Sequence, residues 1–491
     1  MQPTDARPDV VIVGGGIAGL AAAFFLRDEP VRVTVLEGSS RLGGKLSVSD
    51  VEGVAVDEGA EALLVTRPEG TALIAELGLD GDRVQPGTTS SAIWTRGALR
   101  ALPRRQFMGV PSDMAELAAS GVLSSEGVAR ACQDLELPAT ARDGDVSVAR
   151  YVGARLGAEV VDRLVDPLLG GVYAGRSDDL SFDATLPALA AASRRYRSLA
   201  EAARSLLPAA PPGGDQDGKP AAGTRAGGSV FTTLAGGLGT MPEFLAKASG
   251  AQVRTGTMVR ELSRTDVGWR LTMGSAAAAG QVDADAVIIA VPARPAGRLL
   301  AGVPGARAAV AALAEISYAS MAIVTLAYPR SAFPEPGLAA LGRSGYLVPA
   351  VDGRAVKAVT FSSVKWPHLA GLPGHGADPV EIVRCSVGRL GEEALLQRAD
   401  EELAALAAAE LAEATGVRGV PAATRVTRWG GALPQYSVGH LDRVARIRAA
   451  VASQPGLAVC GAAYDGVGIP ACVGTARAAA SQVTAFLAAR R

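Results

Sequence analysis

The residues with the clearest chemical potential in this sequence form a glycine-rich loop close to the first residue. The loop consists of Gly14, Gly15, Gly16, Ile17, Ala18 and Gly19. Glycines at these spacings permit a tight turn, let the backbone approach a pyrophosphate at Gly16, and let a helix pack close to a strand at Gly19. The N–H groups at the start of that helix would face the phosphates. The loop therefore predicts a dinucleotide-binding site.

The segments on either side of the loop fit this prediction. Residues 9–13 are a β-branched run typical of a strand buried on both faces of a parallel sheet, and residues 20–26 continue as a helix. A second strand, 31–36, ends at Glu37 and Gly38, where a carboxylate can accept hydrogen bonds from ribose hydroxyls and disfavours a 2′-phosphate. A glycine-rich turn without a ligand is the alternative, but the complete order of strand, loop, helix, strand and acid argues against it.

The residues after Glu37 distinguish a flavin from a nicotinamide cofactor. Arg41-Leu42-Gly43-Gly44-Lys45 is the RxGG extension of flavoproteins that bind FAD through a dinucleotide fold. FAD is therefore the predicted cofactor. The sequence shows no Ser/His/Asp set, paired carboxylates or metal-ligand cluster, as expected when a cofactor carries the chemistry and the protein positions it. We predict neither a catalytic side chain nor a metal.

Composition excludes several other classes of protein. The 491 residues include 48 Lys and Arg against 49 Asp and Glu, and the net charge of −1 does not favour a nucleic-acid partner. The four cysteines have no CxxC spacing and only three histidines accompany them, which fits a reducing, cytoplasmic compartment. The apolar run 10–26 lacks the basic segment of a signal peptide, so we expect a soluble chain with at most peripheral membrane contact.

Two types of strand alternate along the rest of the chain. Residues 286–292 form a continuous apolar run typical of a parallel strand, whereas 321–328, 357–363 and 381–387 have the period-two pattern of antiparallel strands. The predicted fold class is α/β plus α+β: a Rossmann-like FAD-binding domain interleaved with an antiparallel-sheet substrate domain and an α-helical insert. The predicted boundaries are 1–56, 229–292 and 421–491 for the FAD-binding domain, 57–98 and 293–420 for the substrate domain, 99–207 for the insert, and 208–228 for a flexible linker.

Five further segments complete a set of motifs along the chain. They lie at 167–175, 231–242, 361–368, 429–440 and 461–470. Together with the two glycine motifs, they resemble the bacterial protoporphyrinogen/coproporphyrinogen oxidases of haem synthesis, within the FAD-dependent amine-oxidase-like superfamily. The Tyr-x-Val-Gly-His and Gly-Val-Gly-Ile-Pro segments are the most specific of these motifs. The Ala/Arg-rich composition and the lack of an anchor favour the soluble Gram-positive branch.

The resemblance implies an activity and partners. The implied reaction is the FAD-dependent six-electron oxidation of coproporphyrinogen III to coproporphyrin III, with O2 as acceptor and release of H2O2. FAD would be bound non-covalently, because Cys460 and Cys472 flank the C-terminal glycine turn outside the covalent motif of monoamine oxidases. The next haem-pathway enzyme is a further candidate partner. Alternatives are a protoporphyrinogen IX oxidase, another FAD oxidase or desaturase acting on amines or carotenoids, and a non-catalytic tetrapyrrole carrier.

The resemblance also implies contact residues. Toward FAD it implies, besides the glycine loop, Glu37, Lys45, Gly59, Ala60, Glu61, Ala62, Val259, Trp429, Val467, Gly468 and Ile469. Ordinary core packing is an equal alternative for Val259 and Trp429. Toward the tetrapyrrole it implies Arg67 facing the propionates and Val172 lining the pocket. An exposed arginine and core helix packing are the respective alternatives. Lys365 and His440 match motif residues that we expect to be structural.

Overall fold

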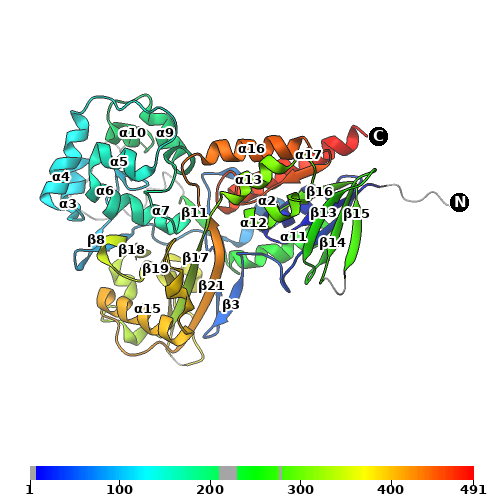
Figure 1. The fold of residues 1–491 in the computed structure, drawn as a ribbon. Coiled ribbons are helices and arrows are strands. Elements are labelled where there is room, and N and C mark those ends of the chain that lie inside the picture. Colours follow the sequence, from blue (N-terminus) through cyan, green and yellow to red (C-terminus); the bar gives the residue numbers. More distant parts are fainter. Residues whose placement is uncertain (1–6, 209–228, 276–278, 377, 491) are drawn as a thin grey trace.

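The computed structural model describes residues 7–208, 229–275, 279–376 and 378–490, and a five-stranded parallel sheet lies in the half that holds both termini (Figure 1). Side chains of β1 alternate between two apolar clusters, Val10 and Ile12 in one and Val11 and Val13 in the other, because successive residues of a strand point to opposite faces. The order of strands is β12 (Gln252–Arg254), β2 (Arg32–Leu36), β1 (Asp9–Val13), β16 (Ala286–Ile289) and β22 (Leu457–Val459). The Rossmann-like prediction is confirmed.

Helices cover one face of this sheet. They are α1 (Ile17–Phe25), α11 (Met241–Ser249) and α17 (Ile469–Ala488), with α2 (Pro68–Glu76) against α17. The other face packs on a small antiparallel sheet and three helices. These are β13 (Val259–Arg264), β14 (Trp269–Met273), β15 (Gly280–Ala284), α12 (Ala293–Leu300), α13 (Arg307–Ala314) and α16 (His440–Ala452). The sheet is thus buried on both faces, as the continuous apolar strands predict.

A second, seven-stranded sheet lies at the lower left of Figure 1. Its strands run antiparallel except for the β18–β7 pair. In order they are β21 (Ala423–Pro434), β17 (Tyr318–Pro329), β20 (Val380–Val387), β19 (Val356–Phe361), β18 (Gly345–Leu347), β7 (Ala92–Thr95) and β8 (Ala98–Ala101). Helix α15 (Asp400–Thr415) packs on one face. The hairpin β3 (Val48–Val51) and β4 (Val54–Asp57) packs on the other, with Trp366.

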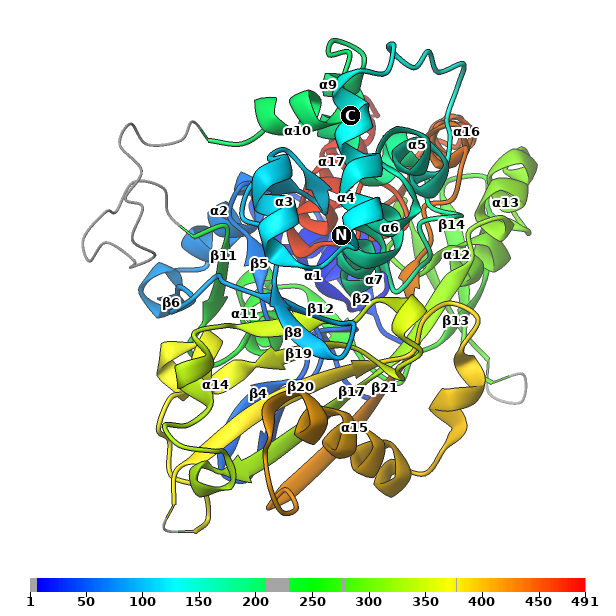
Figure 2. The same cartoon turned by 90° about the vertical axis from the view of Figure 1, so that its left-hand side faces the viewer.

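A third, helical part lies above the seven-stranded sheet (Figures 1 and 2). Its helices are α3 (Met114–Ser120), α4 (Ser125–Cys132), α5 (Val148–Leu156), α6 (Ala158–Val160), the π-helical turn Val161–Val165, α7 (Asp166–Tyr173), α8 (Phe182–Thr185), α9 (Pro187–Ser193) and α10 (Leu199–Ser205). The Arg155 guanidinium ties this part together from inside, with its Nε 2.5 Å from the Asp134 carboxylate. Within the described residues, no helix combines the length and apolar character that crossing a membrane requires.

Short strands join the helical part to the rest of the molecule. β11 (Phe231–Leu234) lies between β5 (Leu63–Leu64) and β6 (Arg83–Val84), and β9 (Gln106–Phe107) pairs with β10 (Val110–Pro111). The predicted linker at 208–228 lies, apart from Pro208, outside the described residues.

Several boundaries differ from those that the sequence predicts. The α12–α13 segment, assigned above to the substrate domain, packs in the same apolar cluster as Val11 and Val13 of the parallel sheet. Strand β21, assigned above to the FAD-binding domain, pairs with β17 in the seven-stranded sheet. We therefore propose that the nucleotide fold extends past α13 and resumes after Pro434. Local sequence patterns identify these elements but do not state which sheet each one joins.

Candidate functional site

The glycine-rich loop combines one position that the fold restricts with one that it leaves open. Gly14 has a φ of 112°, and a β-carbon there would lie 2.6 Å from the Ala290 carbonyl oxygen. At Gly16, by contrast, a β-carbon would have no described atom within 4 Å. Ile17 and Ala18 follow at the start of α1, whose first N–H groups face outward from the same loop. The empty space at Gly16 fits a pyrophosphate, which needs close approach to the backbone.

Glu37 braces this loop from the end of β2. Its carboxylate accepts hydrogen bonds from the N–H of Gly15 and the N–H of Ser39, both at 2.7 Å. The next residue, Gly38, packs against Met258: a β-carbon added to Gly38 would lie 2.7 Å from Met258 Cε. Val259 comes next to this methionine, but its side chain is buried in the apolar cluster that includes Leu36. A contact of the Val259 backbone with FAD stays a prediction.

Lys45, Gly59 and Trp429 come together from three distant parts of the chain. A β-carbon at Gly59 would lie 1.9 Å from the Lys45 carbonyl oxygen and 3.4 Å from Trp429 Cζ2. The Trp429 indole N–H donates to the Glu58 carbonyl at 2.9 Å. Burial lowers the pKa of the Lys45 ammonium. The tryptophan thus fixes the Gly59 segment beside the lysine.

Arg41 explains the first residue of the RxGG motif. Its guanidinium donates to the carbonyl oxygens of Leu42, Gly44 and Leu46, at 3.0, 2.6 and 3.2 Å. These bonds hold the glycine pair in a tight loop, with Gly43 and Gly44 at φ values of 99° and 59°. The motif therefore shapes the backbone next to Gly16, where Gly43 and Gly16 form an isolated parallel bridge.

Glu61 lies at the centre of a three-residue charged cluster. Lys365 Nζ donates to Glu61 Oε1 at 2.6 Å, and Arg384 Nη1 donates to Glu61 Oε2 at 2.5 Å. Arg384 Nη2 also donates to the Gly59 carbonyl at 2.7 Å. Burial would raise the pKa of Glu61, but the two cations outweigh burial and lower it to about 2. The cluster fixes the 59–62 segment, which includes Ala60 and Ala62, against the seven-stranded sheet.

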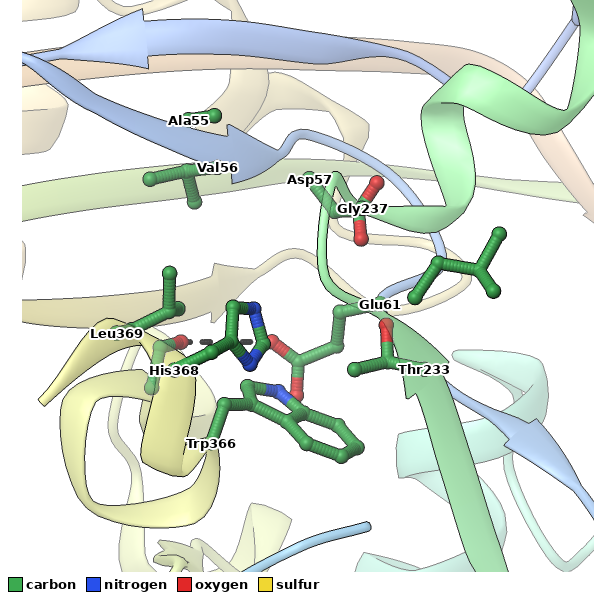
Figure 3. Close-up of a pocket in the computed structure, with 11 residues that line it drawn as sticks. Ala55, Val56, Asp57, Glu61, Thr233, Gly237, Trp366, His368 and Leu369 are labelled. Atoms are coloured by element: carbon green, nitrogen blue, oxygen red, sulfur yellow. Dashed lines mark hydrogen bonds between the residues drawn. The ribbon is translucent and has the colours of Figure 1, made fainter. Parts of the chain in front are cut away.

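A small pocket with a cavity volume of about 20 Å³ lies beside Glu61 (Figure 3). Asp57, Trp366 and His368 point toward it, and Ser362 donates to Glu61 at 3.4 Å. The Asp57 carboxylate accepts from the N–H groups of Leu238 and Gly239, at 2.9 and 2.8 Å. Burial raises the pKa of Asp57 to about 6 and lowers that of His368. These groups connect β4 to the loop before α11.

The C-terminal glycine turn is held by the Tyr-x-Val-Gly-His motif. Tyr436 Oη donates to the Ala462 carbonyl at 2.6 Å and accepts from the Gly466 N–H at 2.8 Å. The His440 ring stacks on Tyr436 with centroids 3.8 Å apart. Burial lowers the pKa of His440 to about 4, so its ring is neutral. Stacking on Tyr436 agrees with the structural role expected of His440, which stays a prediction.

The turn leads directly into α17. Gly468 caps this helix, and Ile469 is its first residue, followed by Pro470. Val467 packs against the apolar cluster of the helical part. Arg67 lies beside the turn, with its Nη1 3.5 Å from the Asp465 carbonyl and its Nη2 3.4 Å from the Glu69 carboxylate. The Arg67 side chain is 42% exposed, so it stands at the rim of the turn.

Val172 lies on α7 and is 40% exposed, which rules out core packing. Its neighbour Gly171 lies against β18: a β-carbon added to Gly171 would be 3.7 Å from Leu347 Cδ2. Leu347 in turn lines an open cleft with a cavity volume of about 240 Å³. Val172 is not among the residues that line this cleft, so its contact with the tetrapyrrole stays a prediction.

A comparison with protein families matches residues 17–484 to the model described as flavin containing amine oxidoreductase. The chain belongs to this family. The match includes α1, the Glu61 cluster and nearly all of α17. A flavin is accordingly the cofactor of this chain, in agreement with the open position at Gly16.

Curated relatives of this chain are named coproporphyrinogen III oxidase, and two of them are described here. The protein from Mycobacterium tuberculosis (strain ATCC 25618 / H37Rv) is 38% identical over 485 residues, covering 98% of both chains. The one from Bacillus subtilis (strain 168) is 31% identical over 492 residues, covering 99% of both. A protoporphyrinogen oxidase from Bos taurus is 30% identical over 505 residues, covering 96% of this chain and 98% of the relative.

Solved structures extend the agreement to the fold. A crystal structure described as a protoporphyrinogen oxidase from Exiguobacterium sp. 255-15 aligns with a TM-score of 0.81 at 28% identity, over 98% of this chain and 99% of the other. A putrescine oxidase triple mutant aligns with a TM-score of 0.67 at 18% identity, over 99% of both chains, and shows the shared fold alone.

Arg384 and Tyr436 are two residues of this chain that sequence reasoning missed. Arg384 is the single cation in the buried strand β20, and a buried cation is the signal that could have indicated a buried partner. Tyr436 belonged to the motif that led us to name His440, but the hydroxyl of the tyrosine makes the contacts to the turn.

Proposed function

We propose that this chain is an FAD-dependent oxidase that converts coproporphyrinogen III to coproporphyrin III. Three O2 would accept the six electrons and six protons, which yields three H2O2. The observation that carries the proposal is similarity over nearly the whole chain to relatives named coproporphyrinogen III oxidase. One of these relatives is 38% identical to this chain. The open cleft beside the Glu61 cluster supports it, because a tetrapyrrole needs a large site next to the flavin.

The chain's own residues would bind and orient FAD. Gly16 leaves room for the pyrophosphate, and Lys45 and Trp429 lie beside the Gly59 segment. The first N–H groups of α17 would donate hydrogen bonds to the bound cofactor. When bound, FAD supplies the two-electron acceptor chemistry that a porphyrinogen oxidation requires. None of the described residues needs to act as a nucleophile or general base in this scheme.

We also propose that FAD is bound non-covalently. Cys472 lies in the first turn of α17 and Cys460 at the end of β22, and both are buried as free thiols. Burial raises the pKa of Cys472 to about 11, and that of Cys460 also rises, so neither is a ready thiolate. Denaturing gel filtration should release all flavin from the protein. The free thiols are also consistent with a cytoplasmic enzyme, which we propose.

Anaerobic flavin reduction tests the function. Coproporphyrinogen III should bleach the flavin absorbance of the purified holoenzyme, and admission of O2 should restore it with formation of H2O2. Protoporphyrinogen IX, a primary amine and a carotenoid serve as competing substrates in the same assay. Bleaching by an amine or carotenoid but not by either porphyrinogen would contradict the proposal. Porphyrin binding without any flavin reduction would indicate a carrier instead.

A further inference from the structure

The open cleft, with a cavity volume of about 240 Å³, has a single charged side chain in the described part of its lining. It is lined by residues from the loop before β7 and from β11, β18 and β19. Hydroxyl groups come from Thr88, Thr89, Ser91, Ser344 and Thr360. Phe231 contributes a flat apolar surface and is 38% exposed. Among the described residues that line the cleft, Lys365 is the one with a charged side chain.

Lys365 shares Glu61 with a second, more deeply buried cation. The side chain of Arg384 is 6% exposed and donates both to Glu61 and to the Gly59 carbonyl. The Lys365 side chain is 17% exposed and faces the cleft. One carboxylate balances only one of the two cations. The group of three therefore carries one net positive charge, and its more exposed cation lies in the cleft wall.

No carboxylate is among the described residues that line the cleft with Lys365. Asp57 is the next acid beside Glu61, but both of its oxygens accept backbone N–H groups at the start of α11. It lines the small pocket of Figure 3, which shares no described lining residue with the cleft, and its charge acts on Arg384. An anionic group entering the cleft would thus meet Lys365 as its nearest opposite charge.

We propose that Lys365 binds a carboxylate of the substrate, while Arg384 holds Glu61 and the 59–62 segment in position. The inference rests on the proposed function and extends it to one specificity-determining residue. A coproporphyrinogen has four propionates, so it needs cations at several points of its rim. Arg67 stands at the glycine turn, on a different element, and is available to a second carboxylate. Phe231 and Leu347 would contact the apolar macrocycle in the same cleft.

Equilibrium binding of two porphyrins tests Lys365 without requiring turnover. The ligands are coproporphyrin III and its uncharged tetramethyl ester, titrated into holoenzyme in one detergent-containing buffer and followed by porphyrin absorbance. Lys365→Met should raise the Kd for coproporphyrin III about tenfold, because a charge-assisted contact is lost. The Kd for the ester should stay within about twofold. Lys365→Arg should retain the preference for the acid, and Lys247→Met, an exposed lysine of α11, is the matched control.

A second pair of variants separates binding from structural support. Lys365→Gln keeps a hydrogen-bond donor for Glu61 while removing the charge, so it should reproduce the selective loss even if Lys365→Met folds poorly. Arg384→Met should instead lower flavin retention, because the Gly59 carbonyl and Glu61 lose their buried partner. In the Lys365 variants the ratio of flavin to protein should remain that of the wild type.

Either of two results would overturn the inference. One is an equal weakening of acid and ester, which would mean that Lys365 only supports the cleft. The other is unchanged affinity for coproporphyrin III in both Lys365→Met and Lys365→Gln. Failure of the proposed function is a separate result, since it would appear as wild-type holoenzyme whose flavin no porphyrinogen reduces.

Discussion

Gly19 packs directly on the carbonyl oxygen of Gly14: a β-carbon added to Gly19 would lie 1.9 Å from that oxygen. This contact lets α1 approach β1 closely. Gly16 is the residue directly before α1. A β-carbon there would have no such neighbour. The same motif therefore contains a glycine that the fold requires and one that only a ligand requires.

Substitution of these two glycines should give two different failures. Gly16→Val should leave the apoprotein's melting temperature close to that of the wild-type apoprotein but abolish FAD retention, because the side chain fills the pyrophosphate space. Gly19→Val should lower the apoprotein's melting temperature, since helix and strand must separate. Thermal unfolding and the flavin-to-protein ratio measure both effects. A yellow Gly16→Val protein with the normal ratio would refute the assignment of this loop.

Arg67 should distinguish the two candidate substrates. Arg67→Ala should raise the KM for coproporphyrinogen III about tenfold more than the KM for protoporphyrinogen IX, because only the former has two additional propionates to place. Steady-state kinetics read by porphyrin fluorescence provide the measurement. Arg270→Ala is a suitable control, since Arg270 is similarly exposed and pairs with Asp283 on β15, on the nucleotide side of the molecule. Equal effects on both substrates would mean that Arg67 does not read the propionates.

Tyr436 should couple stability to flavin binding. Tyr436→Phe removes the hydroxyl that links the Ala462 carbonyl to the Gly466 N–H, so two half-buried backbone groups lose their partner. We expect the free energy of unfolding to fall by about 1–3 kcal/mol and FAD to dissociate more readily. Chemical denaturation and flavin release rates check the two effects. Tyr196→Phe, at an exposed position, should change neither.

Glu61 should contribute to acid sensitivity. Its folded pKa of about 2 lies below the ordinary value of 4.5, so its contribution to stability is present above about pH 4.5 and is lost as pH falls toward 2. The stability advantage of wild type over Glu61→Gln should therefore shrink by roughly 1–3 kcal/mol between about pH 6 and pH 3. Asp57 titrates in the opposite sense, and because the Glu61 charge helps to raise the pKa of Asp57, the Asp57 contribution also becomes smaller in Glu61→Gln. A constant difference in the free energy of unfolding across this range would contradict the charged cluster.

The sequence by itself determined the features that depend on neighbouring residues. The glycine loop, β1, β2 and the acid at Glu37 follow from backbone freedom at glycine and from β-branched runs, both of which act over a few residues. It also predicted the fold class, because continuous and alternating apolar strands need different sheets.

Only the tertiary structure decided which distant residues share a site. Glu61 meets Lys365 and Arg384, which lie 304 and 323 positions further along the chain. No local pattern records these contacts, because they depend on how β19, β20 and the 59–62 segment pack against one another. The same holds for Val172, whose exposure depends on α7 standing beside β18. A periodic pattern specifies which face of an element is apolar, whereas the partner of a buried charge is set by the packing of whole layers.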